Sequence, residues 1–375
     1  MPFADELIGE HTAKALIQAI AAATPGTPLT ALSAAVRDLD GRSLRERSDL
    51  LRDALLNDLP GPYDTFAGII RAARDGQPSF TGWMIWPVTS AIAAKAVEDG
   101  GVDAFDDAMV VLADLTSRLT SEFAIRTLLD HSLDRALATI ATWTASPDEG
   151  VRRLASEGTR PFLPWARRVP GLLAAPRATL SILNALYRDE SEYVRRSVAN
   201  HLNDLSRQHP DIVVEAATTW LADPDENTPR LVRHGLRTLI KQGHPGALAL
   251  LGFTTAASVD VVGPTLTATE IPFGGTIAFT ATITNIGTEA ASLAIDYIVH
   301  HMKANGTQRG KTFKLTTATL APGEKRQLSR DHSFREITTR RYHPGAHAVE
   351  LQINGTPIGR ADFTLQPPSP HHRPQ

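Results

Sequence analysis

A short motif that recurs about every forty residues sets the strongest limit on how this chain can fold. Val-Arg-Arg occurs at residues 151–153 and 194–196, and Val-Arg-His follows at 232–234, so the offsets are 43 and 38 residues. Each copy follows a turn rich in acidic residues or proline. A period near 40 with paired helices is typical of HEAT and armadillo repeats, which stack into a curved solenoid. Three short matches can arise by chance in an arginine-rich chain, although the shared type of turn argues against this.

The hydrophobic spacing over the first 250 residues is that of helices. Apolar residues recur three and four positions apart, and the breaks between such runs are short and rich in Pro, Gly and Asp. The pattern predicts helices over residues 7–20, 44–56, 104–115, 123–143 and 192–206. Because short connections favour an all-α stack, we expect residues 1–252 to form an α-solenoid of HEAT-like repeats.

The spacing changes near Gly252 to the period of a β-strand. Residues 276–283 alternate apolar with polar side chains, similar stretches follow, and the Asn-Gly pair at 354–355 is typical of a tight turn. Several short strands with regular turns predict an antiparallel β-sandwich over residues 253–365. It must be held by packing alone, since the chain has no cysteine.

The composition excludes several kinds of site and segment. No apolar run approaches membrane-spanning length, and early acidic residues argue against a signal peptide. The chain has no cysteine, no glycine-rich phosphate loop and no nucleophile elbow, and its His pairs lack ligand-spaced partners. We therefore expect neither a metal nor a cofactor. Residues 366–375, rich in Pro and His, are expected to form a disordered tail.

Charge is distributed unevenly along the chain. Residues 1–145 hold 20 acidic and 12 basic side chains, whereas residues 152–196 hold nine arginines, four acids and no lysine. Such an arginine patch suggests recognition of phosphate or carboxylate groups. A solvated helix face explains it too, and composition alone favours that simpler explanation.

The predicted helix at 192–206 has an unusual polar side. Its apolar residues fall on one side of the helix, and the opposite side carries Arg196, Asn200, Asn203 and Asp204. Asn and Asp are poor helix formers, so their presence in mid-helix costs stability and suggests a binding role. Alternatively, the helix ends early and Asn203 and Asp204 cap it.

The preceding repeat places Arg153 and Glu157 four residues apart on its polar face. An ordinary ion pair of this kind contributes about 0.3–0.5 kcal/mol and needs no function. However, Arg153 aligns with Arg196, and Glu157 with Asn200, across the repeat. Polar residues of successive repeats would therefore line one groove.

Two further residues are candidates for contact with a ligand. Trp165 lies in a loop of prolines and arginines, where it could stack on a base or sugar, or simply fill a gap between helices. Glu122 shares a helix face with Arg126 near a helix start. It could act in a site, or merely complement the helix dipole.

At these residues the sequence resembles a known family. The matching runs are residues 122–126, 151–161, 163–166 and 193–204. They resemble the AlkC branch of the HEAT-like-repeat alkylpurine DNA glycosylases. Residues 296–301 and 338–345, in the predicted sandwich, resemble the immunoglobulin-like extension that a subset of this branch carries.

The resemblance implies a monofunctional glycosylase of base excision repair. It would remove 3-methyladenine and 3-methylcytosine from duplex DNA, contacting the lesion in the helix rather than flipping it. Carried over by motif, Glu122, Glu157 and Asp204 would be the active-site carboxylates, with Trp165 beside the lesion. The residues expected to hold DNA are Arg126, Arg152, Arg153, Arg160, Arg195, Arg196, Asn200, Asn203, Arg340 and Arg341. We expect a cytoplasmic, nucleoid-associated monomer whose partner is alkylated double-stranded DNA.

Two alternatives stay open at this point. A non-catalytic HEAT-repeat scaffold that binds DNA or a protein partner would use the same arginines. The β-sandwich, with basic residues in its turns, would complete a clamp around DNA, or it is a structural appendage. The basic residues in question are Lys303, Arg309, Lys311, Lys314, Arg340 and Arg341.

Overall fold

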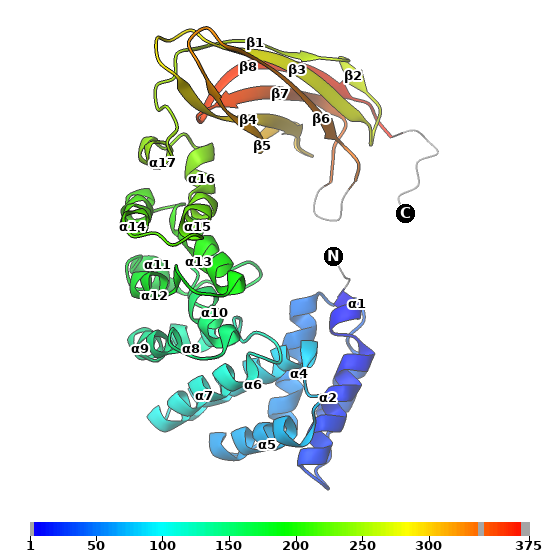
Figure 1. The fold of residues 1–375 in the computed structure, drawn as a ribbon. Helices are drawn as coiled ribbons and strands as arrows, with labels where there is room; N and C mark the ends of the chain where they lie inside the picture. Colours follow the sequence, from blue (N-terminus) through cyan, green and yellow to red (C-terminus); the bar gives the residue numbers. More distant parts are fainter. Residues whose placement is uncertain (1–3, 337–340, 369–375) are drawn as a thin grey trace. The chain divides into compact units, whose positions relative to one another are not determined.

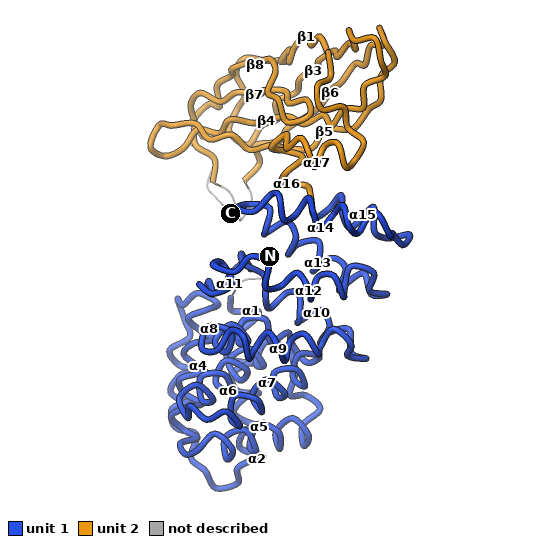
Figure 2. Tube along the Cα trace, turned by 90° about the vertical axis from the view of Figure 1, so that its left-hand side faces the viewer, with its two compact units in different colours: residues 1–235 blue, residues 236–375 orange. Residues whose placement is uncertain are grey.

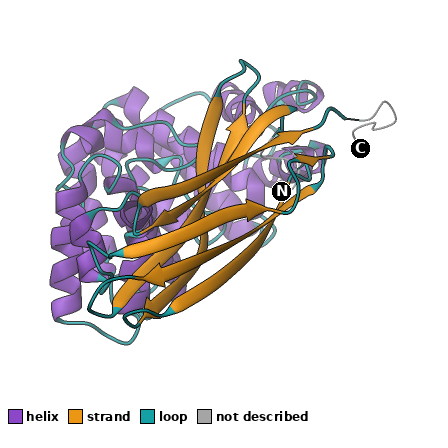
Figure 3. Ribbon diagram, turned by 90° about the horizontal axis from the view of Figure 1, so that it is seen from above, coloured by secondary structure: helices purple, strands orange, loops and turns teal. Residues whose placement is uncertain are grey.

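The computed structural model describes residues 4–336 and 341–368, which fall into two compact units divided after Gly235 (Figure 2). The described part of the first unit is helical, and the second combines two short helices with the strands (Figure 3). The division precedes the change of hydrophobic spacing at Gly252. Arg340 and residues 369–375 of the expected tail lie outside the described residues.

The first unit is a succession of helices, most of them joined by short turns, with longer connections at residues 116–124 and 158–169 (Figure 1). In chain order they are α1 (Ala4–Leu7), α2 (Glu10–Ala23), α3 (Thr30–Arg37), α4 (Leu44–Asp58), α5 (Tyr63–Gly76), the 3-10 turn η1 (Gly82–Met84), α6 (Ile85–Asp99), α7 (Val102–Leu115), α8 (Ile125–His131), α9 (Leu133–Trp143), α10 (Glu149–Glu157), α11 (Pro170–Ala174), α12 (Leu180–Leu186), α13 (Glu192–Leu205), α14 (Pro210–Ala222) and α15 (Thr228–Gly235). The predicted all-α stack is confirmed. In the described part of the chain, no helix is long and apolar enough to span a membrane.

The three copies of the Val-Arg motif lie in α10, α13 and α15. α10 packs against α13, and α13 packs against α15, so the motif marks successive layers of the stack. Val194 and Val232 are fully buried between these layers. The motif valines therefore form the apolar side of the repeat, as their spacing predicts.

The arginine after each of the first two valines holds the turn that precedes its own helix. Arg152 donates to the carbonyl oxygens of Ser146 and Pro147 at 3.0 and 3.1 Å. Arg195 donates to the carbonyl oxygens at positions 189 and 190, at 2.6 and 2.8 Å. The same contact between arginine and turn accounts for the arginine that follows valine in both repeats.

Two predictions about helix bounds need correction. The single helix expected over residues 123–143 is two helices, α8 and α9, separated at Ser132, whose φ of −147° is not helical. The helix α13 continues to Leu205, so Asn203 and Asp204 lie inside it. The alternative in which these two residues cap a shorter helix is therefore wrong.

The second unit contains a sandwich of two sheets, whose strands are long and twisted (Figure 3). Its elements are α16 (Arg237–Lys241), α17 (Pro245–Leu250), β1 (Val259–Leu266), β2 (Glu270–Ile271), β3 (Thr276–Asn285), β4 (Ala291–Met302), β5 (Gln308–Leu320), β6 (Lys325–Ser333), β7 (Gly345–Ile353) and β8 (Thr356–Leu365). One sheet has the order β1-β3-β6 and the other β2-β8-β7-β4-β5, with every pair antiparallel except β2 with β8. The predicted sandwich is confirmed.

The turn between β7 and β8 joins the sandwich to α16 and α17. Gly355 approaches Gly243 so closely that a Cβ on Gly355 would stand 2.0 Å from the Gly243 Cα. Asn354, with a left-handed φ of 47°, accepts a hydrogen bond from the Ala294 amide at 2.6 Å and donates to the Thr254 carbonyl at 2.7 Å. The turn thus needs residues that tolerate positive φ and close backbone contact, which Asn and Gly supply.

Candidate active site

Three carboxylates from separate helical segments are joined into one row by two arginines. Glu122 lies in the turn before α8, Glu157 ends α10, and Asp204 lies in the last turn of α13. Arg153 pairs with Glu122 and lies 3.4 Å from a Glu157 oxygen. Arg160 lies 2.6 Å from Glu157 and 2.9 Å from Asp204. The structure thus brings together five of the residues that the sequence singled out, which we call the carboxylate row.

The carboxylate row is buried and has a formal charge of minus one. The exposed fractions of Glu122, Glu157 and Asp204 are 9%, 5% and 1%. Buried charges are costly unless paired, which explains why each carboxylate has an arginine partner. Burial nevertheless raises the pKa of Glu122 above its ordinary value, against the opposing effect of Arg153. Among the described residues, no cluster of three His, Asp or Glu side chains could hold a metal.

Hydroxyl groups complete the surroundings of two carboxylates. Thr120 donates to Glu122 Oε2 at 3.1 Å, and Ser197 donates to Glu157 Oε2 at 2.6 Å. Sequence reasoning missed both residues. Serine and threonine are common on helices and turns, so their type carries no signal, and only the packing of α13 on α10 reveals Ser197.

Arg126 anchors the loop that carries Arg160 and Trp165. It is fully buried and donates to the carbonyl oxygens of Gly158 and Arg160, both at 2.9 Å, and of Arg167 at 2.6 Å. Burial lowers its pKa to about 10. These bonds favour a structural role for Arg126 over the predicted contact with DNA phosphate.

Trp165 is held in an uncommon backbone conformation and is open to solvent. Its φ is 61°, and 58% of the residue is exposed. A left-handed conformation costs a residue other than glycine about 1–3 kcal/mol and is found where a site requires it. The alternative in which Trp165 fills a gap between helices is therefore wrong, and the ring is accessible to a ligand.

The other residues expected to hold DNA have varied surroundings. Arg196 is exposed and pairs with Glu192 at 3.3 Å, whereas Asn200 lies 3.1 Å from His234 on α15. Asn203 is buried and Arg341 exposed. Arg152 is held by Asp189 in a two-fold contact at 2.7 and 3.0 Å, and Arg195 by turn carbonyls. Of this set, Arg196 and Arg341 are the ones most open to a phosphate.

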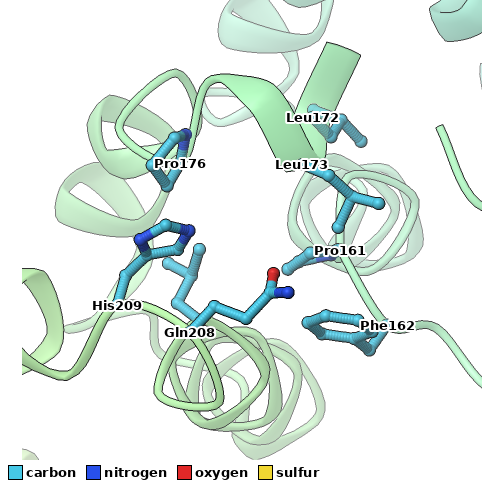
Figure 4. Close-up of a pocket in the computed structure, with 8 residues that line it drawn as sticks. Pro161, Phe162, Leu172, Leu173, Pro176, Gln208 and His209 are labelled. Carbon is cyan, nitrogen blue, oxygen red and sulfur yellow. The ribbon is translucent and has the colours of Figure 1, made fainter. Parts of the chain in front are cut away.

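An apolar depression is lined in part by Pro161 and Leu205, which follow Arg160 and Asp204 in the sequence (Figure 4). It is lined by Pro161, Phe162, Leu172, Leu173, Pro176, Leu205, Gln208 and His209. The guanidinium groups of Arg168 and Arg207 lie 5.0 and 4.9 Å from the centre of the Phe162 ring. The Phe162 ring thus lies close to two largely exposed arginines, which raise the local positive potential beside the depression.

The chain is similar to several known proteins and protein families. A family model described as "DNA alkylation repair enzyme" matches residues 113–239, which include the whole carboxylate row, and one described as the C-terminal Ig-like domain of the uncharacterised protein YhaZ matches residues 260–367. The uncharacterized protein YhaZ of Bacillus subtilis (strain 168) is 33% identical over 323 residues, which are 86% of this chain and 87% of that one. The structure of Pseudomonas fluorescens alkylpurine DNA glycosylase AlkC, bound to DNA containing an abasic site analog, is 32% identical, with a TM-score of 0.85 over 98% of this chain and 100% of that one.

Proposed function

This chain belongs to the AlkC-type alkylpurine DNA glycosylases, among the DNA alkylation repair enzymes, and we propose that it excises cationic alkylated bases from duplex DNA. Its substrates under this proposal are 3-methyladenine and 3-methylcytosine. The observation that supports the proposal best is the convergence of Glu122, Glu157 and Asp204 in one row. The related AlkC is bound to DNA with an abasic site analog, and an abasic site is what base removal leaves.

The chemistry of the substrate suits a site built from carboxylates. A base methylated at N3 already carries a positive charge, so it leaves without a general acid. The remaining requirements are to stabilise an oxocarbenium-like sugar and to orient a water molecule. Ionised carboxylates supply both, by electrostatic preorganisation and base catalysis. In this scheme the protein needs neither a metal nor a covalent nucleophile.

The arginines of the row explain how a polyanion can approach three carboxylates. Without compensating cations, the carboxylates would repel the DNA backbone. Arg153 and Arg160 offset two of the three carboxylate charges of the row, and exposed arginines such as Arg196 and Arg207 would bind phosphates. Trp165 would contact the lesion nucleotide, without flipping of the base. The basic turns of the sandwich, including Arg341, would form a second set of contacts with the DNA.

A base-release assay with defined lesions tests the proposal. Duplexes that carry a single 3-methyladenine or 3-methylcytosine should yield the free base and an abasic site. Glu122→Gln, Glu157→Gln and Asp204→Asn should each lower the excision rate by about 100-fold or more, in the range of a lost electrostatic group. Glu215→Gln is the matched control, because Glu215 is an exposed carboxylate that pairs with Arg177 at 2.6 Å.

The competing function is that of a scaffold that binds DNA without chemistry. It predicts salt-sensitive DNA binding and no released base from any of the lesions. A surface that only binds a polyanion gains nothing from three buried carboxylates, so the row favours the enzyme. Binding without base release, in a protein whose fold is intact, would establish the scaffold instead.

A further inference from the structure

The buried side of Glu157 is held by hydroxyl groups that the reaction outlined above does not use. Ser197 Oγ lies 2.6 Å from Glu157 Oε2, and it is in turn hydrogen-bonded to Ser156 Oγ. Ser156 and Ser197 are 0% and 2% exposed. The two serines come from the facing helices α10 and α13, so this contact exists only when the two layers are packed.

The direction of each hydrogen bond follows from the chemistry of the groups. A carboxylate oxygen accepts only, so the Ser197 hydroxyl donates to Glu157. A hydroxyl has one hydrogen, and Ser197 has used it, so the Ser156 hydroxyl donates to Ser197. The chain of donors therefore runs one way, from Ser156 through Ser197 to the carboxylate.

A buried histidine is hydrogen-bonded to the backbone of Ser156, the first donor in this series of hydrogen bonds. His201 is fully buried, with Nδ1 2.9 Å from the Ser156 carbonyl oxygen and Nε2 3.1 Å from Thr179 Oγ1. Because a carbonyl can only accept, the proton of the imidazole sits on Nδ1, and Nε2 accepts from Thr179. Burial lowers the pKa of His201 to about 4, so the ring is neutral at neutral pH.

The other oxygen of Glu157, Oε1, is held by two arginines. Arg153 and Arg160 lie 3.4 and 2.6 Å from Glu157 Oε1. The side chains of Arg153 and Arg160 are 13% and 8% exposed, so they are nearly as buried as the carboxylate with which they pair. The remaining titratable groups near Glu157 are Glu122, Tyr193, His201 and Asp204.

We propose that Ser197 is a positioning residue for Glu157, supported by Ser156 and His201, and that its hydrogen bond fixes the orientation of this carboxylate in the site. The inference rests on the proposed glycosylase function. It predicts that the hydroxyl of Ser197 matters for the rate of excision and not for DNA affinity.

The test is single-turnover release of 3-methyladenine from duplex DNA by the full chain, measured from pH 5 to 9. Ser197→Ala should lower the rate constant by about 10- to 100-fold, the range for a lost hydrogen bond to a charged group, at unchanged Kd for DNA. Ser206→Ala is the matched control, since Ser206 is equally buried at the end of α13 and bonds only the Asn203 carbonyl, at 2.7 Å.

A second pair of variants separates positioning from a merely structural role. Ser197→Cys keeps the shape of the side chain with a weaker donor and should lose less of the rate than Ser197→Ala. In a Glu157→Gln background, Ser197→Ala should have no further effect on excision. A wild-type protein that releases no base would refute the proposed function. An active wild type whose Ser197 variants keep their rate, or lose rate equally without Glu157, would overturn this inference alone.

Discussion

Replacing Arg160 by methionine should destabilise the helical unit by about 3–5 kcal/mol, because buried carboxylates lose their shared cation. The Arg160 side chain is 8% exposed and bonds Glu157 and Asp204 at 2.6 and 2.9 Å. Glu157 retains Arg153 and Ser197, whereas Asp204, at 2% exposure, retains Arg207 at 3.7 Å. Most of the cost should therefore fall on Asp204. Methionine has a similar length, so the loss reflects charge rather than volume.

Tryptophan fluorescence is suited to this measurement. All five tryptophans lie between residues 83 and 220, within the helical unit, so their emission follows the unfolding of that unit alone. For a unit of this size each kcal/mol corresponds to about 2–4 °C, which gives a Tm lower by about 6–20 °C in Arg160→Met. Arg177→Met is the control, because its exposed pair with Glu215 should contribute at most about 1 kcal/mol.

A double variant provides the decisive comparison. If the cost is an uncompensated charge on Asp204, then Asp204→Asn should recover part of the stability lost in Arg160→Met, by about 0.5–3 kcal/mol of coupling. A single variant that unfolds within about 1 kcal/mol of the wild type would refute the electrostatic reasoning. So would a double variant whose two losses simply add.

Three further outcomes are expected. Trp165→Ala should change the free energy of unfolding by less than about 1 kcal/mol, because the side chain is largely exposed, while lowering base release; unchanged release would remove Trp165 from the site. Burial lowers the pKa of His347 below its ordinary 6.5, so the unfolded chain binds that proton more readily. The stability of the sandwich should be full above pH 6.5 and fall as the pH drops below it, and a flat circular-dichroism stability profile from pH 7.5 to 5 would contradict this. Asn354→Ala removes three side-chain hydrogen bonds and should cost the sandwich about 2–4 kcal/mol by calorimetry, whereas a cost below about 0.5 kcal/mol would show that these bonds are not needed.

Helical spacing anticipates only part of the carboxylate row, and the grouping of Glu122, Glu157 and Asp204 was expected from the resemblance to the family. Arg153 and Glu157 are four residues apart, and the repeat offset places α13 against the same groove. The partners of the arginines could not be anticipated in this way. Arg126 and Arg152 bond carbonyl oxygens of turns, and the position of a carbonyl depends on the local path of the backbone, which residue types do not specify.

The strand β6 shows the same limit in the second unit. Among residues 325–333, Leu328 and His332 are the buried ones, so the strand has no alternation of apolar and polar residues for a sequence pattern to detect. It lies at the edge of its sheet and is fixed by pairing with β3. Ser197 and His201 were missed for a related reason, since their importance comes from what lies across the helix interface.

The contact between Gly243 and Gly355 has a practical consequence for anyone who shortens this protein. Two backbone segments meet there with no side chain between them. A side chain at either glycine would therefore force the two segments apart. A truncation at Gly252 would separate α16 and α17 from the strands against which they pack and would expose Leu248 to water. A break after Gly235 would instead follow the boundary between the two compact units.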